Sequence, residues 1–301
     1  MVSLKDLFRK SKSMENVQKK AEKNIPEKKE EKKKGKAVRE RRYSFLVEEV
    51  FETSHSQGIM VLGTIHGKIR EGDTMYLYRQ EQPVREVHVL TIERGPRDVV
   101  QMARNVKVGL CLDLESTEEI SRFSVLSSVK PVEGELANRL IENPRLFGLM
   151  MEYRRLYTNS VYMDALLYEL CQAKFVVPLY MDRPPLPRPD GTFAFSEDAH
   201  IGFRPLKKAD DSTQTVFPAF TDEIALASWK GAYHEGQPRR LATMMLPHLI
   251  GYVEKGHAGL VINPFGPEPV YFPKELLEQV EQSDVFQTKY RPKQQTDSEK
   301  G

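Results

Sequence analysis

The segment from Tyr43 to about Ser116 constrains the fold most, because short apolar runs alternate there with turn-forming residues. The turns fall at Ser56-Gln57-Gly58, His66-Gly67 and Glu71-Gly72-Asp73. The intervening runs have strand composition: SFLVEEVFET, IMVLGTI, TMYLY, VREVHVLTIE and NVKVGLCLDL. About six short strands without a helix should close into a small all-β barrel, since an open sheet would leave its edges unpaired.

The apolar pattern also predicts details of this barrel. The even-numbered residues from 106 to 114 are apolar and are expected to face the core. The odd-numbered residues between them, which include Cys111, are expected to face solvent. Along EVHVLTI the alternation breaks at Leu90, as a β-bulge would require. Gly72 is suited to positive φ in a tight turn, and Gly63, inside a strand, permits a close backbone approach.

Residues 134–285 mix helical and strand patterns, which predicts an α/β (α+β) domain after a linker at residues 117–133. Asn143-Pro144 resembles a helix N-cap followed by proline at the first helical position, and Thr221 should begin another helix. Further helices are expected at VYMDALLYELCQA, PHLIGYVEK and PKELLEQV, and strands at KFVVPLY, RRLATMM and AGLVINP. AHIGFRPLKK and TQTVFPAFT flank a polar turn, which predicts a hairpin.

The two ends of the chain are expected to be disordered. Residues 1–42 hold 16 Lys/Arg against 7 Asp/Glu, a net charge of +9, whereas the whole chain has a net charge of +2. So few apolar residues cannot offset the entropy of ordering, which predicts a disordered basic arm. Residues 286–301 are expected to form a disordered tail. The arm supplies candidate nucleic-acid contacts: Lys28, Lys29, Lys32, Lys33, Lys34, Lys36, Arg39, Arg41 and Arg42.

Residues 43–115 combine the opening RYSFLVEEVFETSHSQG, the closing ARNVKVGLCLDL and glycines at 58, 63, 67 and 72. In this combination they resemble the second domain of elongation factor Tu and related translation GTPases. The resemblance implies a six-stranded barrel that helps to hold RNA ends and packs against a GTPase domain. However, the phosphate-binding string Gly-x-x-x-x-Gly-Lys-Ser/Thr is absent from the sequence, and residues 1–42 are too few and too charged to fold a nucleotide-hydrolysis domain.

The second half contains ENPRLFGLMMEYRRLY, MDALLYELCQAKFVVPLY, VFPAFTDEIALASWK and GLVINPFGPEPVYFPKELLEQV. Together these segments resemble the N-terminal domain of the enhanced serine sensitivity (SseB) family. The resemblance implies little chemistry and supplies no catalytic residues. Within it, the sharpest local signal is Asn263-Pro264-Phe265-Gly266, a candidate ligand or partner loop whose alternative interpretation is a rigid turn between strands.

No motif in the sequence points to a reaction. The 7 histidines show no His-Glu-x-x-His spacing, and neither Gly-x-Ser-x-Gly nor Cys-x-x-Cys occurs. Cys111 and Cys171 lie in different segments, which cannot form a disulfide framework and suits a reducing compartment. We therefore expect no catalytic residue, cofactor or metal site. A reactive thiol at Cys111 is the alternative to an inert one.

These patterns predict a non-enzymatic, cytoplasmic binding or adaptor protein with an unidentified protein partner. The alternative is an RNA- or ribosome-associated protein that uses the barrel and the basic arm, and a third hypothesis is an unrecognised enzyme in the SseB-like domain. No apolar region of a secretory signal follows Met1. The most apolar later window, LATMMLPHLIGYV, is shorter than the ~20 residues that a membrane span needs.

Overall fold

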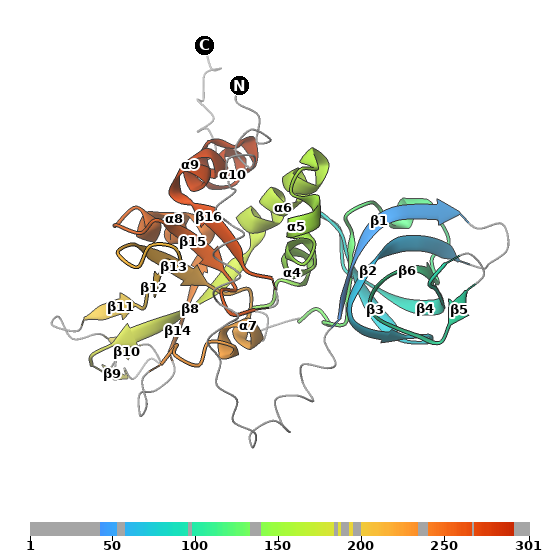
Figure 1. The fold of residues 1–301 in the computed structure, drawn as a ribbon, viewed down its shortest axis with the longest axis horizontal. Helices are drawn as coiled ribbons and strands as arrows, with labels where there is room; N and C mark the ends of the chain where they lie inside the picture. The colour runs from blue at the N-terminus through green and yellow to red at the C-terminus, as the bar shows by residue number, and fades with distance from the viewer. Residues whose placement is uncertain are drawn as a thin grey trace, which may run out of the picture. The chain divides into compact units, whose positions relative to one another are not determined.

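The protein, described by a computed structural model, forms two compact units (Figure 1). The structure describes residues 43–52, 58–95, 98–132, 140–183, 186–187, 193–194, 200–233, 240–266 and 268–291. Among these residues, the first unit extends to Leu170 and the second begins at Cys171. The division therefore falls inside a helix, α6 (Ser160–Gln172), and not at the predicted boundary near residue 134.

The first unit is built on a closed, antiparallel, six-stranded barrel, which confirms the predicted fold of this segment. The strand order is β3-β7-β1-β2-β6-β4, and pairing of β3 with β4 closes the ring; a two-residue strand, β5 (Val99–Val100), pairs with the end of β4. The barrel strands are β1 (Ser44–Glu52), β2 (Ile59–Arg70), β3 (Thr74–Tyr78), β4 (Arg85–Glu93), β6 (Met102–Leu112) and β7 (Val125–Ser127).

The predicted glycine and bulge positions are confirmed. A Cβ on Gly63 would lie 2.1 Å from the carbonyl oxygen of Leu46 and 2.8 Å from the Phe45 ring, so only glycine lets β1 and β2 approach here. Gly72 has φ +81°, in the left-handed region. The pairing of β4 with β6 shifts register between Val89 and Thr91, as the broken alternation predicted.

Two details of the last predicted strand are wrong. Cys111 is buried rather than solvated, because Gly58 approaches so closely that an added Cβ would stand 3.0 Å from the Cys111 Sγ. Val106 is 38% exposed rather than part of the core. It follows Asn105, whose positive φ of 48° marks an irregularity within β6, and the β2–β6 register shifts beside it.

Within the predicted linker at residues 117–133, residues 117–127 belong to the barrel. They hold a 3-10 turn, η1 (Thr117–Glu119), with a capping box on Ser116, and then β7. Strand β7 pairs with β1 on one side and β3 on the other, so its three buried residues complete the ring. A strand of only three residues gives little periodic signal in the sequence.

Helices follow the barrel within the same unit. Pro144 begins α4 (Pro144–Met150) as predicted, although the Asn143 side chain makes no capping bond. The helix packs on β1 and β7, and a Cβ on Gly148 would lie 2.5 Å from Val125. A short helix, α5 (Tyr153–Leu156), precedes α6.

The second unit contains two main sheets. One has the order β11-β8-β14 and the other β12-β13-β15-β16; an isolated bridge joins Val176 to Phe220. The strands are β8 (Lys174–Met181), β11 (Ile201–Phe203), β12 (Leu206–Lys207), β13 (Thr215–Ala219), β14 (Leu241–Met245), β15 (Gly259–Ile262) and β16 (Val270–Pro273). A separate pair comprises β9 (Leu186–Pro187) and β10 (Phe193–Ala194). The mixture of helices and strands agrees with the predicted α/β class.

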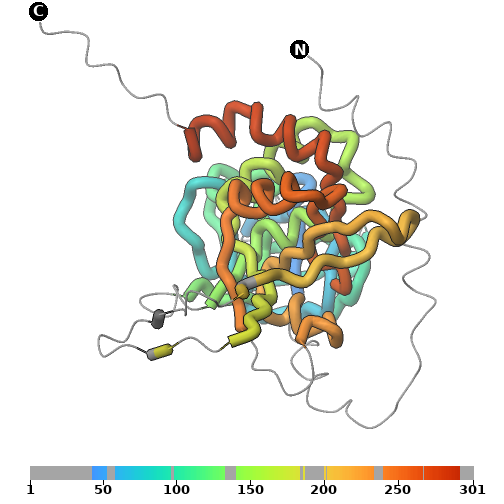
Figure 2. Tube along the Cα trace, turned by 90° about the vertical axis from the view of Figure 1, so that its left-hand side faces the viewer, coloured from blue at the N-terminus to red at the C-terminus, as the bar shows by residue number. Residues whose placement is uncertain are grey.

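Four helices complete the described part of this unit, and Figure 2 shows the last two in red along one edge. They are α7 (Glu223–Ala227), α8 (Leu246–Val253), α9 (Lys274–Gln282) and α10 (Asp284–Tyr290). Asp222, and not Thr221, caps α7. Helix α10 corrects the predicted disordered tail over residues 286–290, because Phe286 is buried there. Among the described helices, none has the length and apolar character that crossing a membrane requires.

Candidate functional site

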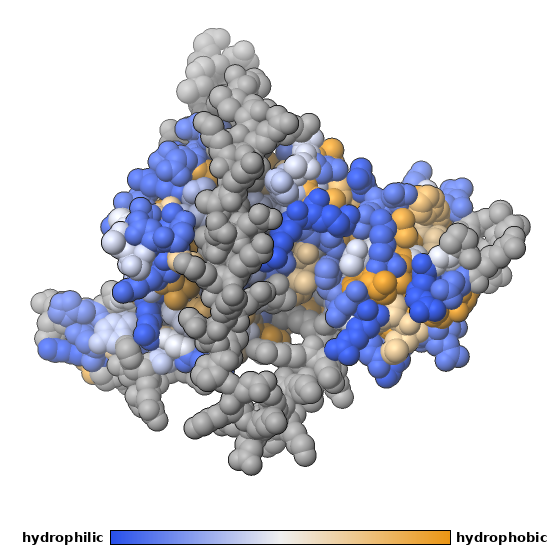
Figure 3. Space-filling model, viewed as in Figure 1, coloured by the Kyte–Doolittle hydropathy of each residue, from blue (hydrophilic) through white to orange (hydrophobic). Residues whose placement is uncertain are grey.

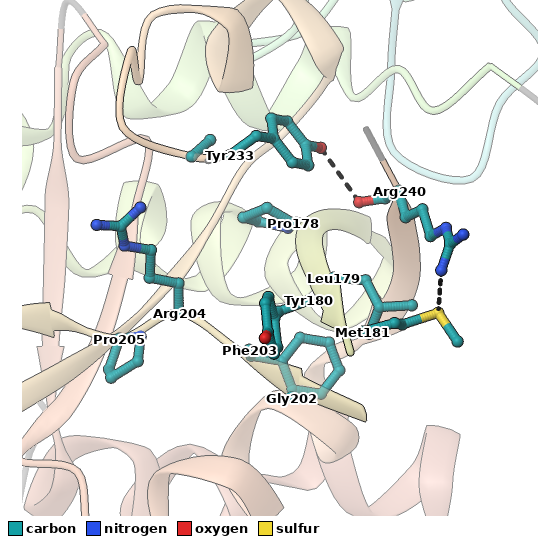
Figure 4. A pocket seen from close by; sticks show the side chains of 11 residues that line it. Pro178, Leu179, Tyr180, Met181, Gly202, Phe203, Arg204, Pro205, Tyr233 and Arg240 are labelled. Carbon is teal, nitrogen blue, oxygen red and sulfur yellow. Dashed lines mark hydrogen bonds between the residues drawn. The ribbon is translucent and has the colours of Figure 1, made fainter. Parts of the chain in front are cut away.

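A cavity of about 260 Å³ lies in the second unit (Figure 4). Its lining comprises residues 178–181 of β8, residues 202–205 in and after β11, Ala232, Tyr233 and Arg240. Pro178 is the last β8 residue paired with β14, and pairing with β11 begins at Leu179. Proline lacks an N–H donor and is tolerated where a strand changes neighbours. Because of this change of neighbours, Arg240, which precedes β14, and the residues of β11 lie around the same part of β8.

The floor of the cavity is apolar and held in place by aromatic contacts. The ring of Phe203 packs edge-on against Tyr252, with centroids 4.7 Å apart, and against Phe217 at 5.7 Å. Gly202 has empty space in front of it, since a Cβ there would meet no atom within 4 Å. A ligand group can therefore approach the Gly202 backbone directly.

Two arginines supply the positive charge of the cavity. Figure 4 shows Arg204 and Arg240 on opposite sides of the view, with Pro178 between them. The Arg204 guanidinium donates to the carbonyl oxygen of Gly231. Arg240 Nη1 lies 3.1 Å from the sulfur of Met181 and 3.4 Å from the Arg183 carbonyl oxygen. Among the described residues, both guanidinium groups thus contact neutral acceptors and no carboxylate.

The predicted loop at Asn263 is a tightly bonded turn in the structure. Asn263 is buried with φ +53°; its Oδ1 accepts from the Thr221 amide at 3.0 Å, and its Nδ2 donates to the Thr221 hydroxyl at 2.9 Å. That hydroxyl in turn donates to Asp222 Oδ2 at 2.9 Å. FPAFT and LVINPFG, two of the segments that carry the SseB resemblance, therefore meet at the ends of the parallel strands β13 and β15.

Only part of this loop faces solvent. Phe265 is 44% exposed and stacks on Trp229, with ring centroids 5.5 Å apart, and Trp229 stacks on Phe220 at 6.0 Å. Pro264 and Gly266 complete the turn, in which the Gly266 amide donates to the Asn263 carbonyl at 2.8 Å. A ligand or partner role for this loop stays a prediction. The predicted nucleic-acid contacts from Lys28 to Arg42 lie outside the described residues.

A barrel–helix ion network of five residues lies in the first unit. Glu48 on β1 contacts Lys107 Nζ at 3.1 Å and Arg155 Nη2 at 2.7 Å. Glu152 contacts Arg155 Nε at 2.8 Å and His66 Nε2 at 2.6 Å. The Glu48 and Glu152 side chains are only 10% and 5% exposed, so each buried carboxylate is compensated by cationic or hydrogen-bonding partners. The network ties the start of α5 to three barrel strands.

The ion network should make the first unit sensitive to acid. Burial alone would raise the pKa of Glu152, but hydrogen bonds with His66 and Arg155 outweigh it and lower the pKa below the ordinary 4.5. A lowered folded-state pKa stabilises the fold above pH 4.5, and this contribution disappears as the pH falls through the lowered value. We expect the urea midpoint of the unit, followed by circular dichroism, to decrease as the pH is lowered from 6 to about 3. This decrease should be smaller in Glu152→Gln than in the natural protein.

Glu49→Gln is the matched control, because Glu49 is exposed and lies beside Glu48 on the same strand. Its acid profile should follow that of the natural protein. A Glu152→Gln variant that lost stability in acid as steeply as the Glu49→Gln variant would show that Glu152 contributes nothing to this sensitivity.

The described residues show no ready chemistry beyond these features. Among them, no group of three His, Cys, Asp or Glu side chains is placed to hold a metal ion. Cys111 and Cys171 are both buried, and burial raises the pKa of Cys171 to about 11, which favours the unreactive thiol. Sequence patterns missed the cavity, because Arg204 and Arg240 belong to no motif, and only the pairing of β8 with β11 and β14 brings their two segments to one cavity.

Comparison with known proteins places the cavity in the recognisable part of the chain. A search of the curated proteins finds no match. The family model described as SseB protein N-terminal domain matches residues 149–279. This range contains every residue that lines the cavity and also the Asn263 turn, whereas the barrel lies before it. Residues 149–279 are thus similar to the SseB protein N-terminal domain, as the sequence motifs predicted.

Proposed function

We propose that the chain is a non-enzymatic cytoplasmic binding or adaptor protein that holds a protein partner at the cavity of its second unit. The observation that carries the proposal is a preformed cavity with an apolar floor and two arginines, since ligand sites are typically concave, largely apolar and equipped with a few polar groups. It lies within the segment that is similar to the SseB domain.

An apolar strip that continues from the cavity lining to Leu241 supports a macromolecular partner. Leu241 pairs directly with Pro178, and Gly202 pairs with Tyr180, so these four residues share one face of the β14-β8-β11 sheet. Tyr180 is 42% exposed and Leu241 is 40% exposed. The strip continues beyond the cavity, so a partner that covered both would bury more surface than a small molecule inside the cavity alone.

The test fills the cavity without straining the backbone. Gly202 has open space in front of it and does not have positive φ, so Gly202→Leu should place a side chain in the cavity while the sheet is retained. We expect this variant to recover its protein partner from a lysate of the native host about tenfold less well than the natural protein. The measurement is quantitative mass spectrometry after affinity capture.

Gly251→Leu is the matched control, because Gly251 on α8 also has no atom within 4 Å of an added Cβ and does not line the cavity. It should recover the partner as well as the natural protein. Equal recovery by Gly202→Leu and Gly251→Leu would reject the cavity as the docking site.

The six-stranded closure of the barrel supports the alternative, RNA association through a domain like that of elongation factor Tu. Recovery of RNA that is insensitive to Gly202→Leu would favour that alternative.

A further inference from the structure

Strand β14 is an open edge of its sheet. The order β11-β8-β14 gives β14 a neighbouring strand on one side only among the described residues. The Leu179 amide donates to the Arg240 carbonyl oxygen at 2.9 Å, so these residues form a hydrogen-bonded pair that continues the β8–β14 ladder. Because such pairs alternate along an antiparallel ladder, the N–H and C=O groups of Leu241 and Thr243 point away from β8. Within the described ranges, the structure gives these groups no hydrogen-bond partner.

This edge lacks the features that usually prevent an edge strand from pairing with another chain. Such features are a charged residue, a proline, a bulge or a very short strand. The three other edges of the two main sheets have them: β11 has three residues, β12 has two and includes Lys207, and β16 ends at Pro273. Strand β14 has five residues, LATMM, without a charge, a proline or a register shift against β8. Leu241 is 40% exposed, and Thr243 is exposed as well.

The edge of β14 is complementary to a second copy of itself in the antiparallel orientation. With a two-fold axis at Thr243, this residue lies opposite its own copy, and Leu241 lies opposite Met245 of the second copy. Thr–Thr and apolar pairs are both favourable across neighbouring strands. On the other face of the strand, Ala242 lies opposite Met244, a small side chain against a large one. The Met245 N–H lies 3.4 Å from His248 Nδ1, a long hydrogen bond that a bond between strands can replace.

The size of this edge determines how strongly two copies would associate. On the face that Figure 3 shows, the described surface of the second unit is mainly hydrophilic, so apolar area there would add little to main-chain hydrogen bonds. A standard stable interface uses roughly 20 to 30 residues from each partner, far more than the five residues of β14. The association should therefore be weak and depend on concentration.

We infer that β14 is a self-association surface, at which two copies of the chain pair their β14 strands antiparallel about Thr243. The pairing joins the two β11-β8-β14 sheets into one continuous sheet across a symmetric dimer. A second copy is the occupant that the edge fits, because a neutral strand offers no charge to select a charged partner and its own sequence supplies every opposing residue. The inference goes beyond the proposed docking function, since it uses the edge of the sheet and not the cavity.

The test is sedimentation velocity on the full chain between about 1 and 200 µM, where we expect a dimer with a Kd of about 20 µM. Thr243→Lys and Thr243→Glu should each weaken this dimer at least about tenfold, because the axis places each new charge opposite its own copy. An equimolar mixture of the two variants should form a heterodimer about as readily as the natural protein dimerises, since opposite charges then face each other.

Thr288→Lys is the matched control, because Thr288 on α10 is exposed and lies outside β14. This variant should dimerise like the natural protein. An unchanged urea midpoint by Trp229 fluorescence shows that a Thr243 variant keeps its fold. Gly202→Leu should leave the dimer intact, so loss of the proposed docking and loss of self-association are seen separately.

Three results would overturn the inference. A natural protein that stays monomeric at 200 µM excludes the dimer, and reduced capture of a protein partner by Thr243→Lys would then assign the edge to that partner. Dimerisation of Thr243→Lys as strong as that of Thr288→Lys would place the interface elsewhere. A mixture of Thr243→Lys and Thr243→Glu that remained monomeric would reject the antiparallel pairing about Thr243.

Discussion

Replacement of Gly63 by alanine is expected to destabilise the barrel by about 3 kcal/mol, at the upper end of the usual cost of overpacking. The added Cβ would lie 2.1 Å from the Leu46 carbonyl oxygen and 2.8 Å from the Phe45 ring, and both belong to the strand paired with β2. The carbonyl oxygen is part of the backbone and cannot move without parting β1 from β2. Urea unfolding of the full chain, followed by circular dichroism, measures the loss.

Gly95→Ala is the control for this prediction, because a Cβ at Gly95 meets no atom within 4 Å and the residue does not have positive φ. Its free energy of unfolding should change by no more than about 0.5 kcal/mol, as expected for a surface substitution. If Gly63→Ala were as stable as Gly95→Ala, the close approach of the two strands would be wrong.

The second large effect is expected at Asn263, where alanine should destabilise the second unit by about 3 kcal/mol. The substitution leaves the buried Thr221 amide and hydroxyl without their partner and places alanine at φ +53°. Because Trp229 is the only tryptophan and stacks on Phe265 in the same turn, its fluorescence during urea unfolding reports on this unit.

Two further variants separate the causes of this loss. Asn263→Gly relieves the backbone strain but not the lost hydrogen bonds, so it should be more stable than Asn263→Ala by about 1 kcal/mol. Asn105→Ala also places alanine at positive φ, but it breaks only an exposed bond from the Gly67 amide, so it should cost about 1 kcal/mol. A loss at Asn263 no larger than that at Asn105 would contradict a stabilising role for the buried network.

The barrel could be predicted because its determinants are local. Alternating side chains report which face of a strand is buried, and glycines such as Gly63 report where backbones meet. The three-residue strand β7 escaped prediction, because its place depends on pairing with two distant strands rather than on its own pattern. Helix α10 was missed because DVFQTKY is mostly polar, and only the burial of Phe286 shows that it packs.

The candidate site was less predictable than the fold. The Asn263 turn has recognisable residue types, so its position could be predicted, although its bonds to Thr221 could not. The cavity depends on the registers of β8 with β11 and β14, which bring Gly202 opposite Tyr180 and Leu241 opposite Pro178. A shift of one residue would send these side chains to the other face of the sheet. No local pattern around Arg204 or Arg240 encodes that register.

The closure of the barrel by β7 has a consequence for synthesis of the chain on the ribosome. Strand β1 is made first, but one of its two neighbours, β7, is made last. Until Ser127 has emerged, β1 and β3 each keep an open edge that can pair with strands of other nascent chains. The interval between translation of β1 and β7 is therefore a period in which the incomplete barrel is exposed to aggregation.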